Sequence, residues 1–131
     1  MARDMDFIRE LLLKVDRGER TFETASDDVA SALGISSEGL PSHEEAEKLQ
    51  QHIHLLERAG FLEVEFRSAG GYVQIRDLTY EGYDLLDSIR DPDVWKETKS
   101  RASQIGGWTV DIIKELAKSY LKQKAQQLGF G

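Results

Sequence analysis

The stretch Ser42–Thr79, SHEEAEKLQQHIHLLERAGFLEVEFRSAGGYVQIRDLT, decides the fold of this 131-residue chain. Its first half spaces apolar residues by three and four positions, which is the period of one helix face. These residues are Ala46, Leu49, Ile53 and Leu56. Ser42 and Glu45 have the spacing of a capping box, which satisfies free backbone N–H groups at a helix start. The pattern predicts a helix over residues 43–59 that ends at Gly60.

The second half of the stretch predicts a β-hairpin over residues 61–78. Apolar residues alternate with polar ones on both sides of the turn: Leu62, Val64, Phe66, Val73 and Ile75. Such alternation is typical of strands with one packed face and one wet face, so we expect Phe66 on the packed face and Arg67 on the wet one. Ala69-Gly70-Gly71 supplies the turn, where glycine tolerates a positive φ.

The residues before this stretch predict one helix and one ambiguous segment. Residues 4–16 carry a single apolar stripe and predict a helix. Asp4 and Asp6 lie at its beginning, where negative charge suits a helix start. Residues 19–42 leave two interpretations open. One is a short strand around Phe22, and the other is a short helix capped by Ala25-Ser26-Asp27-Asp28 that runs through Leu33.

The residues after the stretch predict three more helices. Thr79 caps a helix over residues 80–90, Pro92 begins the next one, and Gly106-Gly107 separates it from a last helix over residues 109–128. Their expected inward side chains are Tyr83, Leu86, Ile89, Val94, Trp95, Thr98, Ala102, Ile113, Leu116, Ala117, Tyr120, Leu121 and Leu128.

This order of elements predicts an α+β fold that is mostly helical. A helix that runs directly into a glycine-tipped hairpin is the pattern of a winged helix. Residues 1–90 would form that domain, with residues 43–59 in the recognition-helix position and the hairpin as the wing. Residues 92–131 would form a helical appendage that packs on the domain or mediates self-association.

The composition is that of a globular protein with one hydrophobic core. Hydrophobic residues make up 40% of the chain and charged residues 31%. Cysteine is absent, which excludes disulfides and cysteine-based metal sites. No apolar run is long enough to cross a membrane, and the acidic start does not resemble a signal peptide. We therefore expect a cytoplasmic protein.

The charge is divided unevenly along the chain. Residues 1–91 contain 10 Lys/Arg and 20 Asp/Glu, whereas residues 92–131 contain 7 and 4. The net charge of −7 argues against a protein that coats nucleic acid without selectivity. The basic tail would be a solvated helix face, or it would dock on its own acidic body, on a second copy or on a phosphate backbone.

Several short motifs resemble those of a known family. They are Arg3-Asp4-Met5-Asp6, His52-Ile53-His54-Leu55-Leu56, Ala59-Gly60-Phe61, Leu78-Thr79-Tyr80-Glu81-Gly82, Trp95 and Gly106-Gly107. The chain resembles a family of small uncharacterised proteins of phages and prophages, which is known as a domain of unknown function. The resemblance fades over residues 19–42. It implies a winged-helix-like fold and a bacterial host cell, and it brings no catalytic residues.

No motif indicates an enzyme or a metal site. The chain lacks a nucleophile–histidine–acid pattern, a glycine-rich phosphate loop and a His-Glu-x-x-His motif. His52 and His54 lie two residues apart and so point to nearly opposite sides of a helix, and His43 lies more than two turns away. We therefore expect no enzymatic activity, no cofactor, no bound metal and no small-molecule substrate.

The winged-helix pattern suggests duplex DNA as a partner. The exposed side of the recognition helix and the wing would present Lys48, Gln51, His52, Arg58 and Arg67 to bases or phosphates. The first turn of that helix, however, contains Glu44, Glu45 and Glu47, which would repel phosphate. The first hypothesis is therefore a DNA-binding or transcription-regulator-like protein, and it rests on fold analogy.

The alternative hypothesis is a protein-interaction or dimerisation adaptor that keeps the scaffold without binding DNA. Its candidate partner-binding residues are Trp95, Trp108, Tyr120 and Leu121, because aromatic residues are enriched at interface centres. The same aromatic residues could instead fold back and complete the core. Homodimerisation through residues 109–128 is one form of this alternative.

Overall fold

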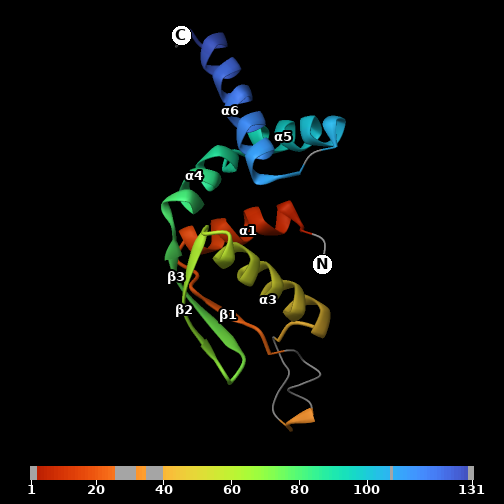
Figure 1. Ribbon diagram of the computed structural model, residues 1–131, viewed down its shortest axis with the longest axis vertical. Helices are drawn as coiled ribbons and strands as arrows, with labels where there is room; N and C mark the ends of the chain where they lie inside the picture. The colour runs from red at the N-terminus through yellow and green to blue at the C-terminus, as the bar shows by residue number, and fades with distance from the viewer. Residues whose placement is uncertain (1–2, 26–31, 35–39, 107, 130–131) are drawn as a thin grey trace.

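The computed structural model describes residues 3–25, 32–34, 40–106 and 108–129 (Figure 1). These residues form an α+β fold that is mostly helical, with a three-stranded antiparallel sheet. The elements are α1 (Met5–Asp16), β1 (Thr21–Glu23), α3 (His43–Arg58), β2 (Leu62–Ser68), β3 (Tyr72–Leu78), α4 (Tyr80–Ile89), α5 (Pro92–Ile105) and α6 (Val110–Gln127). All the helices expected outside residues 19–42 are confirmed, with small differences at their ends.

The sheet contains one strand more than the predicted hairpin. Its strand order is β1-β3-β2, and β1 pairs with β3 so that Phe22 lies opposite Val73. The short strand expected around Phe22 is therefore confirmed, and this side chain is buried. The helix proposed from Ala25 through Leu33 falls largely on residues outside the described part of the chain, so it stays a prediction.

A β-bulge overturns the predicted faces of Phe66 and Arg67. Val64 pairs with Ile75 and Phe66 pairs with Gln74, so Glu65 is an extra residue without a partner on β3. Successive side chains of a strand point to opposite faces, and one extra residue reverses the faces that follow it. Phe66 consequently lies on the solvent face and is 48% exposed. Arg67 lies on the inner face, opposite Val73.

The helix starts follow from local capping. The Asp4 carboxylate accepts a hydrogen bond from the Phe7 N–H, and the Ser42 hydroxyl accepts one from the Glu45 N–H at 3.2 Å. The Ser42 hydroxyl also donates to the Glu45 carboxylate at 3.0 Å. Thr79 and Asp91 cap α4 and α5 in the same way. Each cap satisfies N–H groups that have no partner within the helix.

Gly82 allows α4 to lie directly against the connection between α3 and β2. A Cβ atom at this position would lie 1.9 Å from the Phe61 carbonyl oxygen, which is inside van der Waals contact. Thr79 adds a second contact here, because its hydroxyl donates to the Gly60 carbonyl at 2.5 Å. The glycine of the Leu-Thr-x-x-Gly motif is thus required by close backbone packing.

The buried apolar side chains form one cluster that extends from α1 to α6. Val94, Trp95 and Ala102 of α5 and Ile113 and Ala117 of α6 belong to it together with α1, α3, α4 and the sheet. The predicted boundary between residues 1–90 and 92–131 stays a prediction. Among the described residues, no helix combines the length and the apolar character of a membrane span.

The outer half of α6 differs from the prediction. Leu121 and Leu128 were expected to face inward, but they are 39% and 70% exposed. Figure 1 shows why: α6 crosses α5 with its first turns and then extends away from the other elements towards the C-terminus. The helix therefore continues beyond the core, and its apolar spacing continues with it.

Candidate functional site

The exposed side of α3 carries a row of polar side chains at helical spacing. Gln51, His54 and Arg58 follow one another at steps of three and four residues, and all three are exposed. They therefore share one face of the helix. This face offers an amide, an imidazole and a guanidinium group, which are all able to donate hydrogen bonds.

A cleft of about 320 Å³ lies beside this row, between α3 and the tip of the β2–β3 hairpin. Its lining combines polar and apolar surface and consists of Thr24, Gln50, Ile53, His54, Arg67, Ser68, Tyr72 and Val73. Gln50 Nε2 donates to the Thr24 carbonyl at 3.0 Å, which ties the helix to the end of β1. The hairpin and α3 thus form two walls of one groove.

Arg67 occupies a different place from the one expected. It was predicted to lie on the wet face of the wing and to reach bases or phosphates from there. The bulge turns it towards α3 instead, where Arg67 Nη2 lies 3.0 Å from Glu57 Oε1. Its side chain is still 46% exposed, so the guanidinium lines the cleft while one of its nitrogens is occupied.

His52 was predicted to lie on the exposed side of α3, and this is wrong. Its side chain is fully buried, and both ring nitrogens form hydrogen bonds. Nε2 accepts a hydrogen bond from the Asp4 N–H at 3.1 Å, so Nδ1 carries the hydrogen and donates to the Lys48 carbonyl at 2.8 Å. His52 therefore anchors α1 to α3, and His54 is the histidine that faces the groove.

Lys48 is also engaged within the chain. Its Nζ lies 2.7 Å from Asp4 Oδ2 and 4.9 Å from the centre of the Phe7 ring. The hydrogen bond from Lys48, helped by the Phe7 N–H, lowers the pKa of Asp4 below its ordinary value, so this carboxylate is ionised near neutral pH. Lys48 remains 44% exposed at the side of α3.

The acidic first turns of α3 are exposed, as the sequence indicates. Glu44, Glu45 and Glu47 all lie in the exposed class. The Glu45 carboxylate accepts a hydrogen bond from the Ser42 hydroxyl, and the Glu47 carboxylate accepts a weak one from Gln51 at 3.4 Å. A negative potential therefore surrounds one end of the polar row, and Arg58 lies at the other.

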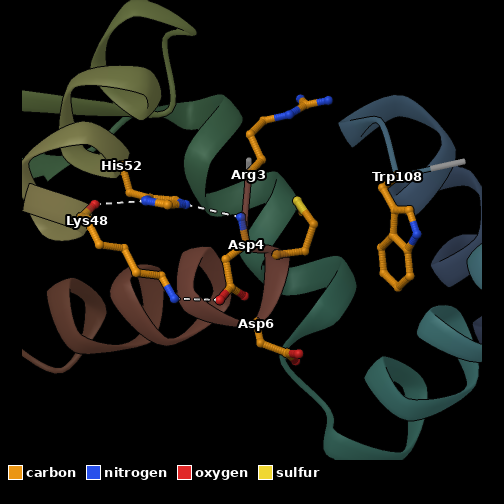
Figure 2. A pocket seen from close by; sticks show the side chains of 7 residues that line it. Arg3, Asp4, Asp6, Lys48, His52 and Trp108 are labelled. Atoms are coloured by element: carbon orange, nitrogen blue, oxygen red, sulfur yellow. Dashed lines mark hydrogen bonds and ion pairs between the residues drawn. The ribbon is translucent and has the colours of Figure 1, made fainter. Parts of the chain in front are cut away.

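A second hollow of about 580 Å³ lies where α1 begins (Figure 2). Asp4 and Asp6 lie on one side of it and Trp108 faces them from the other. Asp6 Oδ1 accepts hydrogen bonds from Trp95 Nε1 at 2.8 Å and from Lys99 Nζ at 3.0 Å. Burial raises the pKa of Asp6, but these two hydrogen bonds outweigh it and hold that pKa below its ordinary value.

The four candidate partner-binding residues have different environments. Trp95 is buried and bonded to Asp6, so it completes the core and is not available as a partner contact. Tyr120 is half-buried, with Arg101 and Lys124 against its ring at 5.3 and 5.7 Å. Trp108 and Leu121 are 38% and 39% exposed, so they alone of the four present large apolar surface.

Sequence reasoning missed Gln50, His54 and Tyr72 as groove residues. The signal was present for His54, because it lies three residues after Gln51 and four before Arg58. Tyr72 could not be assigned, since its place in the groove depends on the register of the hairpin. Within the described ranges, no three histidine, aspartate or glutamate side chains are arranged to hold a metal ion.

Comparison with known proteins identifies the family of this chain. Residues 2–109 match the family model described as "Hypothetical protein (DUF2513)". An uncharacterised protein of Haemophilus influenzae is 32% identical over 126 residues, which cover 94% of this chain and 98% of the relative. No solved structure matches the chain.

Proposed function

The chain belongs to the DUF2513 family of hypothetical proteins, and we propose that it acts as a non-enzymatic, DNA-binding winged-helix protein of the transcription-regulator type. The order α1, β1, α3, β2, β3 and the strand order β1-β3-β2 support a winged helix with α3 in the recognition position. Topology alone is an analogy, so the argument for function rests on the surface of α3.

The observation that carries the proposal is the row Gln51–His54–Arg58 beside the cleft. Glutamine pairs well with adenine, and arginine pairs well with guanine or phosphate, so this row suits the edges of base pairs in a major groove. The hairpin forms the second wall of the same groove and would reach the backbone beside the helix. The cleft brings Arg67, Ser68 and Tyr72 to that contact.

The charges near α3 predict the character of the binding. Non-specific affinity comes mostly from cations that neutralise phosphates. Lys48 and Arg67 are each ion-paired inside the chain, and Glu44, Glu45 and Glu47 lie exposed on the first turns of α3. We therefore expect weak binding to a mixed sequence, tighter binding to a selected site, and a shallow dependence on salt.

The test is fluorescence anisotropy with two duplexes at two salt concentrations. One duplex has a mixed sequence, and the other comes from rounds of binding selection on a random pool. We expect the double variant His54→Ala/Arg58→Ala to weaken binding to the selected duplex about tenfold or more. Lys96→Ala, on the exposed side of α5, is the matched control and should leave affinity unchanged. If the wild type binds neither duplex at the lower salt, the proposal is wrong.

A charge-neutralising variant tests the same surface in the opposite direction. Glu44→Gln/Glu45→Gln/Glu47→Gln removes three negative charges without adding a cation. If α3 meets phosphates, this variant should bind the mixed duplex more tightly than the wild type does. An affinity equal to that of the wild type would mean that DNA does not approach the start of α3.

One set of observations favours the adaptor as a second candidate function. Lys48 and Arg67 are engaged within the chain, and Trp108 and Leu121 expose apolar surface. An adaptor predicts no DNA binding in the titration above. It also predicts that Trp108→Ala or Tyr120→Ala changes the oligomeric mass measured by light scattering. An unaltered mass in both variants would count against it.

The setting we propose is the cytoplasm of a bacterial cell, with a phage or prophage origin. The motif resemblance and the bacterial relative support this setting. Fractionation of a producing host would test it, because a cytoplasmic protein should remain in the fraction that sediments neither with membranes nor with the periplasm.

A further inference from the structure

The outer half of α6 is an amphipathic helix with an uncovered apolar stripe. Leu121, Ala125 and Leu128 recur at helical spacing, and Leu128 is 70% exposed. Ile113 and Ala117, the fully buried residues of this helix, lie in its first half. A helical segment gains most of its stability from packing of its apolar face. This stripe is therefore suited to a contact with another molecule.

The charges of residues 118–129 disfavour packing of this segment against the same segment of a second copy. Residues 118–129 contain Lys118, Lys122 and Lys124 and no acidic residue. Two such helices side by side would bring like charges together. Residues 1–91, by contrast, carry twice as many acidic as basic residues. Charge complementarity therefore favours a contact between residues 118–129 of one copy and residues 1–91 of another.

The body contains a matching surface between α1 and α3. A hollow of about 330 Å³ is lined by the apolar side chains of Phe7, Leu11, Phe22, Pro41 and Leu49. Glu45 and Glu10 also line it, together with Lys14 and Lys48. Lys48 is already paired with Asp4. The hollow thus offers apolar surface next to the carboxylates of Glu10 and Glu45.

The geometry points to a second copy of this chain as the occupant. Leu121 and Leu128 of one copy would enter the α1–α3 hollow of the other, and Lys122 and Lys124 of α6 would meet Glu10 and Glu45. The tail points to one end of the long axis and the start of α3 lies towards the other end (Figure 1). Two copies side by side in opposite directions make this contact twice, which gives a closed two-fold dimer. The contact does not use the row Gln51–His54–Arg58, so the variant His54→Ala/Arg58→Ala tests DNA binding separately from the dimer.

Other partners fit these observations less well. Phosphates would satisfy the lysines but would leave both leucines in water. A lipid surface would cover the leucines, but this stripe has only two large apolar residues, and interfacial helices bind in proportion to the apolar area that they bury.

The first experiment is sedimentation equilibrium of the full chain over a range of concentrations. We expect a concentration-dependent mass that approaches a dimer and falls as salt is added. Leu121→Lys/Leu128→Lys should raise the dimer dissociation constant about tenfold or more. Leu33→Lys is the matched control, because Leu33 is also 70% exposed. A wild type that remains a monomer throughout, or a dimer unaffected by the double variant, overturns the inference.

A charge exchange identifies the two surfaces. Lys122→Glu/Lys124→Glu and Glu10→Lys/Glu45→Lys should each be monomeric, because each brings like charges together at both contacts. An equimolar mixture should form a heterodimer, because one contact is then reversed in charge and the other is native. A mixture that stays monomeric rejects this pairing of surfaces. Thermal unfolding of each variant verifies that it is folded.

Discussion

The indole N–H of Trp95 donates a hydrogen bond to the Asp6 carboxylate at 2.8 Å, across 89 positions of sequence. Two residues before Asp6, Asp4 binds Lys48 and His52 of α3. The opening Arg3-Asp4-Met5-Asp6 motif therefore holds α3 with one aspartate and α5 with the other. The motif that carries the family resemblance has a role in assembling the fold.

Acid should weaken this assembly. The pKa values of Asp4 and Asp6 are lowered in the folded chain, so both carboxylates stabilise it above their unfolded pKa. That stabilisation is lost as the pH falls through the lowered folded pKa. We expect the free energy of unfolding to fall below about pH 4.

Urea unfolding at several pH values tests this expectation. Asp4→Asn and Asp6→Asn should each reduce the acid dependence. Both side chains are more than a third exposed, so each ion pair contributes no more than about 1 kcal/mol. Variants with the same acid slope as the wild type would contradict the assignment.

The two histidines of the His-Ile-His segment should respond very differently to truncation. His52→Ala removes a fully buried ring with two hydrogen bonds, and it should cost about 2–4 kcal/mol of unfolding free energy. His54→Ala, at an exposed position, should change that free energy by about 0.5 kcal/mol or less. Chemical denaturation measures the unfolding free energy of both variants. Equal losses would show that His52 does not anchor α1 to α3.

Gly82 should tolerate no side chain. Gly82→Ala would place a methyl group 1.9 Å from the Phe61 carbonyl oxygen, so α4 would have to move away from the connection between α3 and β2. We expect a loss of about 3 kcal/mol or more in unfolding free energy. Gly18→Ala is the control, because its positive φ is strained but the space around it is open. That control should cost about 1 kcal/mol.

Phe66 and Phe22 form a matched pair that tests the bulge. Phe22 is 8% exposed and Phe66 is 48% exposed. Phe22→Ala should cost about 3–5 kcal/mol, as for other buried phenylalanines. Phe66→Ala should cost about 1 kcal/mol or less, mostly from its edge contact with Tyr72. If the two costs are similar, Phe66 lies in the core as simple alternation predicts.

Local signals made most of the fold predictable. Ser42, Thr79 and Asp91-Pro92 mark helix starts because a cap depends on residues within one turn. The stripe of α3 could also have placed the histidines, since His52 lies three residues after Leu49 and four before Leu56. His52 is therefore on the inner side, although its hydrogen-bond partner Asp4 is remote in sequence.

Long-range features could not be predicted in this way. The register of β2 on β3 depends on Glu65 of β2 and Arg76 of β3, which both lack a partner in the other strand, and no pattern within one strand encodes that. The same limit applies to the candidate site, because Arg67 and Tyr72 reach the groove only through this register. The helical spacing of apolar residues along α6 predicted that Leu121 and Leu128 face inward. They are exposed because this spacing does not tell where the neighbouring elements end.

The bulge at Glu65 has a second consequence, which concerns aggregation. Strand β2 forms one edge of the sheet, and a straight edge with free backbone groups can pair with strands of other molecules. An extra residue bends and twists the strand locally, and Glu63 and Glu65 place negative charges beside the bend. The irregularity that exposes Phe66 thus also interrupts the edge that could pair with strands of neighbouring molecules. Deletion of Glu65 should remove the extra residue from this edge strand, although the irregularity at Arg76 of β3 remains, and should make the protein less soluble on storage.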